Sequence, residues 1–191
     1  MKLMEEKILR EGTVLPGNIL KVGSFLNQQL DTAFLAEVTR EFARLFADAG
    51  VTKVITIEAS GIALATLTAY WLGVPCVVVK KHASANLSKD LYTTEITSFT
   101  HNNTYTAVVA KEYLKATDHI LIVDDFLAVG NAIVGLRDII DQAGATLAGC
   151  AIAIEKSFQG GGDALRAEGV RVESLAMVES MTDDSLTFRH S

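Results

Sequence analysis

Two adjacent carboxylates, Asp124 and Asp125, are the side chains of this chain with the clearest chemical potential. Four apolar residues, 120–123, precede them and predict a buried strand, while a turn of small residues around Gly130 and a helical pattern follow. Backbone N–H groups at such a turn and helix start can bind a phosphate. The carboxylates can accept hydrogen bonds from the two hydroxyls of a ribose. The order strand, acidic pair, turn and helix therefore predicts a site for a phosphorylated sugar.

A plainer interpretation of the acidic pair exists. A single Asp at a strand-to-helix turn is more often a helix cap than a ligand. Two Asp followed closely by a glycine among small residues are a less common arrangement. At the carboxyl end of a parallel strand, both carboxylates would face the crevice where open α/β sheets bind ligands. The spacing therefore favours a functional site.

The segment 120–132 resembles the signature of the type I phosphoribosyltransferases. That signature is an apolar strand, two acidic residues, two spacers and then Ala-Thr/Asn-Gly-x-Thr/Ala. The likeness is greatest to the bacterial members that act on xanthine, which share the Asp-Asp-Phe-Leu-Ala run, an early Leu-Lys-Val…Asn-Gln-Gln stretch and a late Glu-Lys-Ser-Phe. One departure stands out, because Val129 stands where Thr or Asn is usual, and the turn ends in Ala132 rather than Thr. The phosphate would then depend on backbone N–H groups more than on hydroxyls.

This resemblance implies an α/β fold, a mostly parallel twisted sheet flanked by helices with a small N-terminal hood. Residues 1–191 would form a single domain, and the hood would come mainly from about 1–30 and the C-terminal region. The implied reaction transfers a phosphoribosyl group from 5-phosphoribosyl 1-diphosphate (PRPP) to xanthine, giving xanthosine 5′-monophosphate and diphosphate. Mg²⁺ is the implied cofactor, held mainly by PRPP and water rather than by a protein cage. We also expect a cytoplasmic homodimer.

The same resemblance assigns the residues that bind PRPP. Asp124 and Asp125 would hold the ribose hydroxyls, and the leaving diphosphate would be neutralised by Lys80 or Lys81. The backbone would bind phosphate groups at two turns, Ala128, Val129, Gly130, Asn131 and Ala132 after the acidic pair, and Ala59, Ser60 and Gly61 after an earlier strand. Taken without the resemblance, the second turn is a plain strand-to-helix connection and the two lysines are a solvated strand edge.

For the base, the resemblance implies recognition of a 6-oxopurine by Lys156. Leu20 and Asn27 match the hood positions for xanthine, and the Asn27 amide could donate to the 2-oxo group. Phe126 is the expected aromatic neighbour of the base. From the sequence alone, Glu155-Lys156-Ser157-Phe158 is more simply a charged strand terminus.

Two alternatives stay open. The enzyme could act on guanine, hypoxanthine or adenine, or the chain could be a non-catalytic regulator that senses PRPP and binds nucleic acid. The net charge of −6 and the lack of room for a separate helix-turn-helix domain argue against a nucleic-acid partner. The motifs of P-loop NTPases, dinucleotide-binding enzymes, serine hydrolases and zinc enzymes are absent.

Strands and helices alternate along the chain, which predicts a doubly wound sheet. Expected helices cover 31–49, 62–72, 131–143 and 163–167, and expected strands cover 53–57, 76–80, 104–110, 120–123, 147–154 and 171–178. Residues 82–103, rich in Ser, Thr, Asn and Lys, predict a long loop that closes over the site. The uncharged stretch 61–79 is interrupted by Gly73-Val74-Pro75, which favours a core helix and strand over a membrane span.

Overall fold

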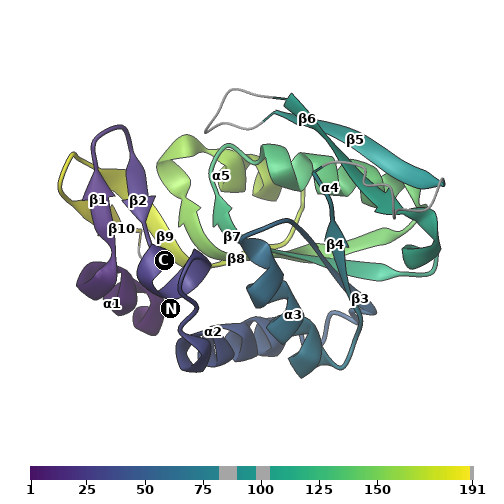
Figure 1. The fold of residues 1–191 in the computed structure, drawn as a ribbon, viewed down its shortest axis with the longest axis horizontal. Coiled ribbons are helices and arrows are strands. Elements are labelled where there is room, and N and C mark those ends of the chain that lie inside the picture. The colour runs from purple at the N-terminus through teal and green to yellow at the C-terminus, as the bar shows by residue number, and fades with distance from the viewer. Residues whose placement is uncertain (82–89, 98–103, 190–191) are drawn as a thin grey trace.

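The computed structural model describes residues 1–81, 90–97 and 104–189. Its centre is a six-stranded sheet in the order β10-β9-β8-β7-β3-β4 (Figure 1). The strands are β3 (Lys53–Ile57), β4 (Cys76–Val79), β7 (His119–Leu127), β8 (Thr146–Lys156), β9 (Val172–Met181) and β10 (Leu186–Phe188). All adjacent pairs run parallel except β9 and β10, which are antiparallel. The predicted mostly parallel sheet is confirmed.

Helices cover both faces of this sheet. The long helices are α2 (Thr32–Leu45) and α3 (Gly61–Leu72) on one face and α4 (Asn131–Gln142) on the other, with α5 (Gly161–Ala167) beside α4 (Figure 1). Strand β7 shows why, because Leu121 and Val123 join the apolar core under α2 and α3, whereas Ile120 and Ile122 join the core under α4. A strand that buries alternate side chains on both faces needs a helical layer on each side.

Several boundaries differ from those predicted, and two of them matter for the site and its surroundings. Helix α2 starts after Asp31, whose carboxylate accepts a hydrogen bond from the Phe34 N–H at 3.1 Å, but it ends at Leu45 rather than at residue 49. Strand β7 does not stop at Val123. It continues to Leu127, because Asp124 and Phe126 keep their pairing with Ile152 and Ile154 of β8.

The N-terminal segment forms a helix, a hairpin and a helical turn. Helix α1 (Lys2–Glu11) leads into an antiparallel hairpin of β1 (Thr13–Leu15) and β2 (Ile19–Lys21), and a π-helical turn, η1 (Gly23–Asn27), follows. Lys7 ties these pieces together, since its ammonium lies 2.7 Å from Asp31 and above the rings of Phe25 and Phe34. Figure 1 shows β10 and the end of β9 at the same end of the molecule as β1 and β2. That these hairpins act together as a hood stays a prediction.

The prediction of one long loop over 82–103 is wrong for its described part. Residues Leu91–Thr97 form β5, which pairs antiparallel with β6 (Thr104–Ala110), and this two-stranded ribbon joins the main sheet edge through a bridge between Lys80 and Val108. The ribbon lies on α4, where a side chain at Gly135 would collide with Ile96. Residues 91–97 are rich in β-branched side chains, which favour a strand once one face has a helix to pack on. Residues 82–89 and 98–103 lie outside the described part.

The remaining short helices are η2 (Lys111–Tyr113) and η3 (Ser157–Gln159). Cys76 and Cys150 are both free. A search of the described helices finds none with the length and apolar character needed to cross a bilayer.

Candidate active site

The acidic pair lies inside strand β7, near its carboxyl end. Asp124 is only 6% exposed, whereas Asp125 is half-buried. One Asp124 oxygen accepts the backbone N–H of Asp125 at 2.9 Å, and no ion pair to Asp124 exists among the described residues. Burial, together with the neighbouring charge of Asp125, raises the pKa of Asp124 well above its usual range, and the charge of Lys81 only partly opposes this. Asp124 is therefore a buried acceptor whose charge is poorly compensated.

The turn at Ala59 to Gly61 reaches the acidic pair directly. A Cβ at Gly61 would lie 2.9 Å from an Asp124 oxygen and 2.3 Å from the Thr56 hydroxyl, so only glycine fits there. The Thr56 hydroxyl is buried and has no hydrogen-bond partner among the described residues. The N-terminus of α3 thus packs directly against Asp124, beside a buried hydroxyl without a hydrogen-bond partner among the described residues. The peptide bond between Glu58 and Ala59 is cis.

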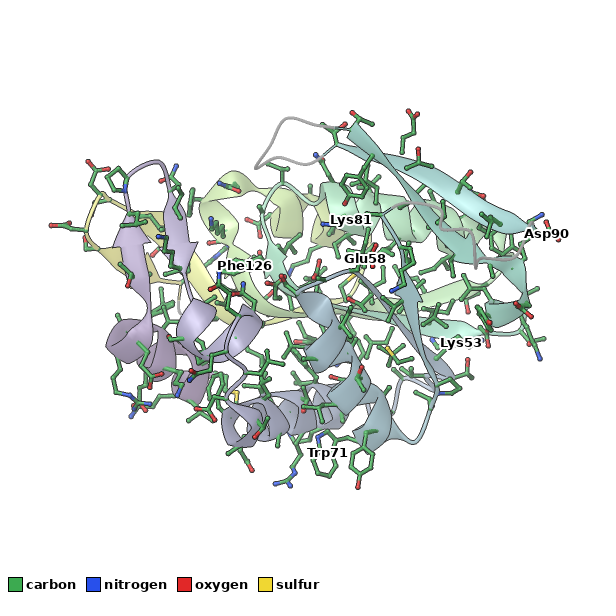
Figure 2. The ribbon with its side chains drawn as sticks, viewed as in Figure 1. Lys53, Glu58, Trp71, Lys81, Asp90 and Phe126 are labelled. Atoms are coloured by element: carbon green, nitrogen blue, oxygen red, sulfur yellow. The ribbon has the colours of Figure 1, made fainter. Side chains whose placement is uncertain are left out.

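Lys80 and Lys81 directly follow β4, the strand next to β3, and both contact Glu58. One Glu58 oxygen accepts the Lys81 N–H at 2.7 Å, and the other lies 3.2 Å from the Lys80 ammonium. Burial pushes the pKa of Glu58 upward, but these two contacts outweigh it, and the pKa falls below its usual value. The Lys81 ammonium lies 5.2 Å from the centre of the Tyr105 ring. Figure 2 shows Glu58 and Lys81 close together in the middle of the molecule.

The turn after the acidic pair has the geometry of a phosphate site. Gly130 adopts φ of 95°, in the left-handed region, and caps the N-terminus of α4. The first N–H groups of a helix have no partner within the helix, so they are free to bind an anion. A cavity of about 140 Å³ lies against this turn. It is lined by residues of the turn and of the ribbon, Ile96, Thr97, Tyr105, Phe126, Leu127, Ala128, Val129, Gly130, Asn131, Ala132 and Ile133.

One predicted phosphate residue has a further contact. The Asn131 amide donates to the Thr97 backbone oxygen at 2.9 Å, which fixes the ribbon next to the turn. Sequence reasoning placed Asn131 in the turn but did not foresee the ribbon as its neighbour. Tyr105 was also missed. Burial and the charge of Asp124 raise its pKa, which places the phenol in the electrostatic field of the acidic pair.

The residues predicted for the base come from three distant segments, and the structure brings them around β7 and β8. Lys156 ends β8, and its ammonium lies 5.6 Å from the centre of the Phe126 ring and donates to the Asn18 backbone oxygen at 2.8 Å. Burial lowers the pKa of Lys156. The Asn27 amide donates to Asp125 at 3.2 Å, and Leu20, in β2 of the hairpin, has a buried side chain. Lys156 thus links the β1–β2 hairpin to the core, while Asn27 links η1 to the acidic pair.

A family model described as "Phosphoribosyl transferase domain" matches residues 27–165. This chain is also 52% identical over 193 residues to the xanthine phosphoribosyltransferase of Bifidobacterium longum (strain NCC 2705), covering 100% of both chains. It is 52% identical over 190 residues to the enzyme of that name from Clostridioides difficile (strain 630), covering 99% of this chain and 100% of the relative. The chain belongs to the phosphoribosyltransferase family.

Solved structures support the same fold. An adenine phosphoribosyltransferase from Giardia lamblia, complexed with 9-deazaadenine, superimposes with a TM-score of 0.79 at 22% identity, covering 93% of this chain and 98% of that chain. The adenine phosphoribosyltransferase of Thermoanaerobacter pseudethanolicus ATCC 33223 gives a TM-score of 0.76 at 21% identity, covering 91% and 99%. Identities this low show the type I phosphoribosyltransferase fold and do not select a base. The sequence relatives carry the argument on substrate.

Proposed function

We propose that this phosphoribosyltransferase transfers the 5-phosphoribosyl group of PRPP to xanthine, giving xanthosine 5′-monophosphate and diphosphate. The observation that carries the proposal is the 52% identity, over the whole chain, to relatives named xanthine phosphoribosyltransferase. The site supports it independently, since a helix-capping turn, an acidic pair and a half-buried lysine beside an aromatic ring come together at the carboxyl ends of β7 and β8.

The 5-phosphate of PRPP binds at the turn Ala128 to Ala132 in this proposal. Gly130 gives the turn its left-handed residue and the N-terminus of α4 provides N–H donors. Val129 and Ala132 contribute no hydroxyl, so the backbone carries the binding. The ribose hydroxyls then donate to Asp124 and Asp125, because these carboxylates lie just before the turn that binds the phosphate.

The diphosphate of PRPP lies at the opposite side of the acidic pair. The backbone of Ala59, Ser60 and Gly61 approaches it at the N-terminus of α3, and Lys80 and Lys81 supply positive charge. Glu58 keeps both lysines at this edge, because it accepts from the Lys81 backbone and pairs with Lys80. Stabilising the departing diphosphate lowers the barrier, since its negative charge grows as the glycosidic bond breaks.

Mg²⁺ fits this arrangement as a companion of PRPP. Among the described residues no group of three or more His, Cys, Asp or Glu side chains could hold a metal ion. Mg²⁺ prefers oxygen ligands, retains several waters and commonly binds through substrate phosphates. When bound, it would neutralise the diphosphate beside the buried Thr56 hydroxyl and the turn at Gly61, while this chain contributes few ligands of its own.

Reaction at the anomeric carbon passes through an oxocarbenium-like centre, as in glycoside cleavage. The chain contributes by holding the ribose, the diphosphate and the base in line. Lys156 donates to the 6-oxo group of the base, Asn27 to its 2-oxo group, and Phe126 packs beside the ring. Phe126 and Lys156 already lie together, and Lys156 donates to the Asn18 backbone oxygen of the hairpin that contains Leu20, which would enclose the base on its outer side.

A steady-state assay with a panel of bases tests this proposal. The purified chain, PRPP and Mg²⁺ are combined with xanthine, guanine, hypoxanthine or adenine, and product formation gives kcat/KM for each base. The expected result is the highest kcat/KM with xanthine. Preference for another purine refutes the xanthine assignment and leaves the family chemistry in place. Binding of PRPP without turnover of any base would instead indicate a regulator.

A further inference from the structure

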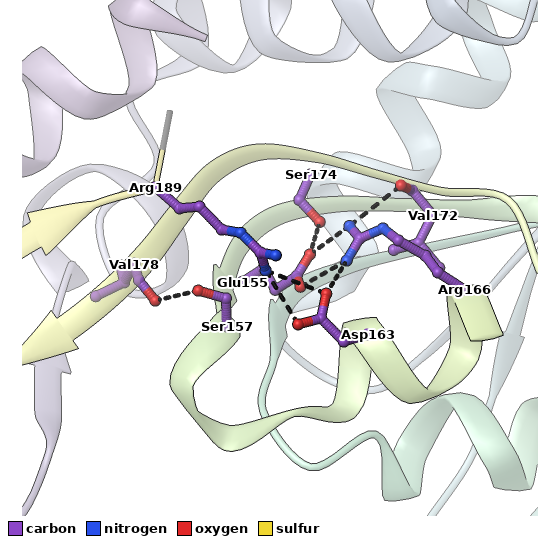
Figure 3. Close-up of polar contacts among 8 residues, drawn as sticks. All are labelled: Glu155, Ser157, Asp163, Arg166, Val172, Ser174, Val178 and Arg189. Carbon is purple, nitrogen blue, oxygen red and sulfur yellow. Dashed lines mark hydrogen bonds and ion pairs between the residues drawn. The ribbon is translucent and has the colours of Figure 1, made fainter. Parts of the chain in front are cut away.

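A cluster of polar side chains lies between the base side and the phosphate turn, outside the residues assigned above. Its centre is Glu155, which directly precedes Lys156 and is fully buried. Figure 3 shows it surrounded by side chains from α5 and β9. The drawn contacts join Glu155, Ser157, Asp163, Arg166, Val172, Ser174, Val178 and Arg189.

Both carboxylate oxygens of Glu155 accept hydrogen bonds from neighbouring side chains. The Arg166 guanidinium binds it through two nitrogens, at 2.9 Å and 2.7 Å, and the Ser174 hydroxyl donates to the second oxygen. Arg166 also donates to the Val172 backbone oxygen at 3.2 Å. A bidentate pair constrains orientation as well as distance. The end of β8 is thereby fastened to both α5 and β9.

The first turn of α5 is shaped to admit this carboxylate. A Cβ at Gly162 would lie 2.0 Å from a Glu155 oxygen, so the helix can approach β8 only without a side chain there. Asp163, in the same turn, accepts a hydrogen bond from Arg166, and both of its oxygens accept from one Arg189 nitrogen. Arg189 thereby anchors the chain after β10 to the helix. Two contacts therefore fix the position of α5: Arg166 binds Glu155 of β8, and Asp163 binds Arg189 after β10.

The start of α5 in turn supports the phosphate turn. The Gly161 N–H donates to the Ala128 backbone oxygen at 3.2 Å. A Cβ at Gly161 would lie 2.3 Å from that oxygen and 2.8 Å from the Gly130 nitrogen. Backbone is thus packed directly on backbone, and any displacement of α5 displaces residues 128–130. The sequence signal was the run Gly160-Gly161-Gly162, which had no assigned role.

The same strand end also positions the base side. Glu155 and Lys156 are neighbours, and the Ser157 hydroxyl donates to the Val178 backbone oxygen at 2.8 Å. With Glu155 fixed from α5 and Ser157 fixed from β9, Lys156 has little freedom to shift along the strand. Its ammonium can then stay between Phe126 and the Asn18 carbonyl.

We propose that Glu155 and Arg166 are positioning residues that couple the two halves of the active site. The buried pair fixes Lys156 toward the base and, through Gly161, fixes the phosphate turn toward PRPP. The inference rests on the proposed function for the identity of the two substrates. It adds that one ion pair, touching neither substrate, sets the KM of both.

The test compares graded variants of the full chain with a matched control. Glu155→Asp shortens the side chain by one methylene and so weakens its contacts with Arg166 and Ser174, while Ser174→Ala removes a single donor. Asp118→Asn is the control, because Asp118 forms a buried pair with Lys53 at 2.7 Å and lies just before β7, at the opposite end of the strand from the acidic pair. Tm, kcat and the KM values for PRPP and for xanthine are measured well below each Tm.

Glu155→Asp is expected to raise both KM values about tenfold and Ser174→Ala about threefold, since small misplacements of binding groups weaken productive complexes. Asp118→Asn is expected to lower Tm while leaving both KM values within about twofold of wild type. Unchanged KM values in folded Ser174→Ala and Glu155→Asp would overturn the proposal, as would a rise in one KM only or an equal rise in Asp118→Asn. If Glu155→Asp does not fold, Ser174→Ala alone decides.

Failure of the xanthine assignment would be visible separately. It appears in wild type, as preference for another base in the panel. The KM comparison is then repeated with the preferred base, and the KM values of the variants alone decide whether Glu155 and Arg166 couple the two halves of the site.

Discussion

Asp124 and Glu155 make an instructive pair, because they occupy similar places on neighbouring strands with opposite surroundings. Both are buried carboxylates near the carboxyl ends of parallel strands, β7 and β8. Glu155 receives two guanidinium nitrogens and a hydroxyl. Asp124 receives a backbone N–H and faces a second carboxylate, and its pKa is raised by burial first and by Asp125 next.

This difference in hydrogen-bond partners distinguishes Glu155, which stabilises the packing of the protein, from Asp124, which we propose binds a ligand. A buried charge with full hydrogen bonding is tolerated, whereas a buried carboxylate without such partners costs stability. Perturbed carboxylates in a cleft are candidates for functional sites. Asp124 carries that cost next to the turn at Gly61, and in the proposed function the ribose hydroxyls of PRPP would supply its missing hydrogen-bond partners.

The largest expected effect comes from removing the charges at the ligand-facing end. Asp124→Asn combined with Asp125→Asn should reduce kcat/KM by more than a hundredfold, because the ribose hydroxyls lose their charged acceptors, at about 3 kcal/mol or more. Circular dichroism and thermal melting should show an intact fold. The measurement is kcat/KM for PRPP at saturating xanthine. Retention of more than about a tenth of wild-type kcat/KM in the double variant would remove the acidic pair from the site.

The two carboxylates should also differ in the sign of their effect on stability. Glu155→Ala leaves the partly buried Arg166 without its partner, and breaking such a pair should lower the free energy of unfolding by about 3 kcal/mol. Asp124→Asn keeps an acceptor for the Asp125 N–H and removes a poorly compensated charge, so it should raise that free energy at pH 7. Urea denaturation of both variants at one pH measures the contrast.

The sign follows from the raised pKa of Asp124. Its folded-state pKa lies above that of the unfolded chain, so the folded state holds the proton more strongly and ionisation opposes folding as pH rises. The gain in the free energy of unfolding of Asp124→Asn over wild type should therefore be small near pH 4 and grow as pH rises through the folded-state pKa of Asp124. An advantage that is the same at every pH would show that Asp124 is not the titrating group.

Much of the frame around this pair was predictable. The apolar runs at 120–123 and 147–154 predict buried parallel strands, and the acidic pair with its turn predicts the ligand edge. Local spacing carries this information because strand, turn and helix start are contiguous. The positive φ of Gly130 belongs to the same class of local signal, since a glycine before a helix start favours it.

The supports of the site were not predictable in the same way. Glu155 finds Arg166 only because α5 folds back against β8, and Asn27 meets Asp125 across 98 positions of sequence. The strand β5 was predicted as part of a loop, since it is mostly polar and its side chains show no apolar alternation, and it is stabilised by pairing with β6 and by packing on α4. Such pairings depend on tertiary contacts that periodicity does not encode.

The raised pKa of Asp124 makes a kinetic prediction as well. Below that pKa the free enzyme carries a protonated Asp124, which loses an acceptor for the ribose, so affinity for PRPP should fall as pH falls, by up to about tenfold per pH unit. Ionisation of the phosphates of PRPP adds its own pH dependence. Calorimetric titration with PRPP and Mg²⁺ across pH, in wild type and in Asp124→Asn, separates the two. Equal slopes in both proteins would assign the whole dependence to the ligand.

The smallest expected effect concerns two residues of the base side. Lys156 directly follows Glu155, and Asn27 donates to Asp125 of the acidic pair. Losing one hydrogen-bond partner in a closed site costs about 1 kcal/mol or more, roughly fivefold. Asn27→Ala should therefore lower kcat/KM for xanthine more than for hypoxanthine, which lacks the 2-oxo group, and narrow the ratio between them about fivefold. Lys156→Ala should lower both together, because both bases carry the 6-oxo group.

Because Asn27 also donates to Asp125, its variant needs a second measurement. The KM for PRPP reports the contact with Asp125, while the xanthine-to-hypoxanthine ratio reports the contact with the base. Asn27→Asp serves as the matched variant, since it keeps the size of the side chain but sets a like charge against Asp125 and should raise the KM for PRPP most. If Asn27→Ala raises the KM for PRPP and leaves the ratio of bases untouched, Asn27 belongs to the acidic pair and the 2-oxo group is recognised elsewhere.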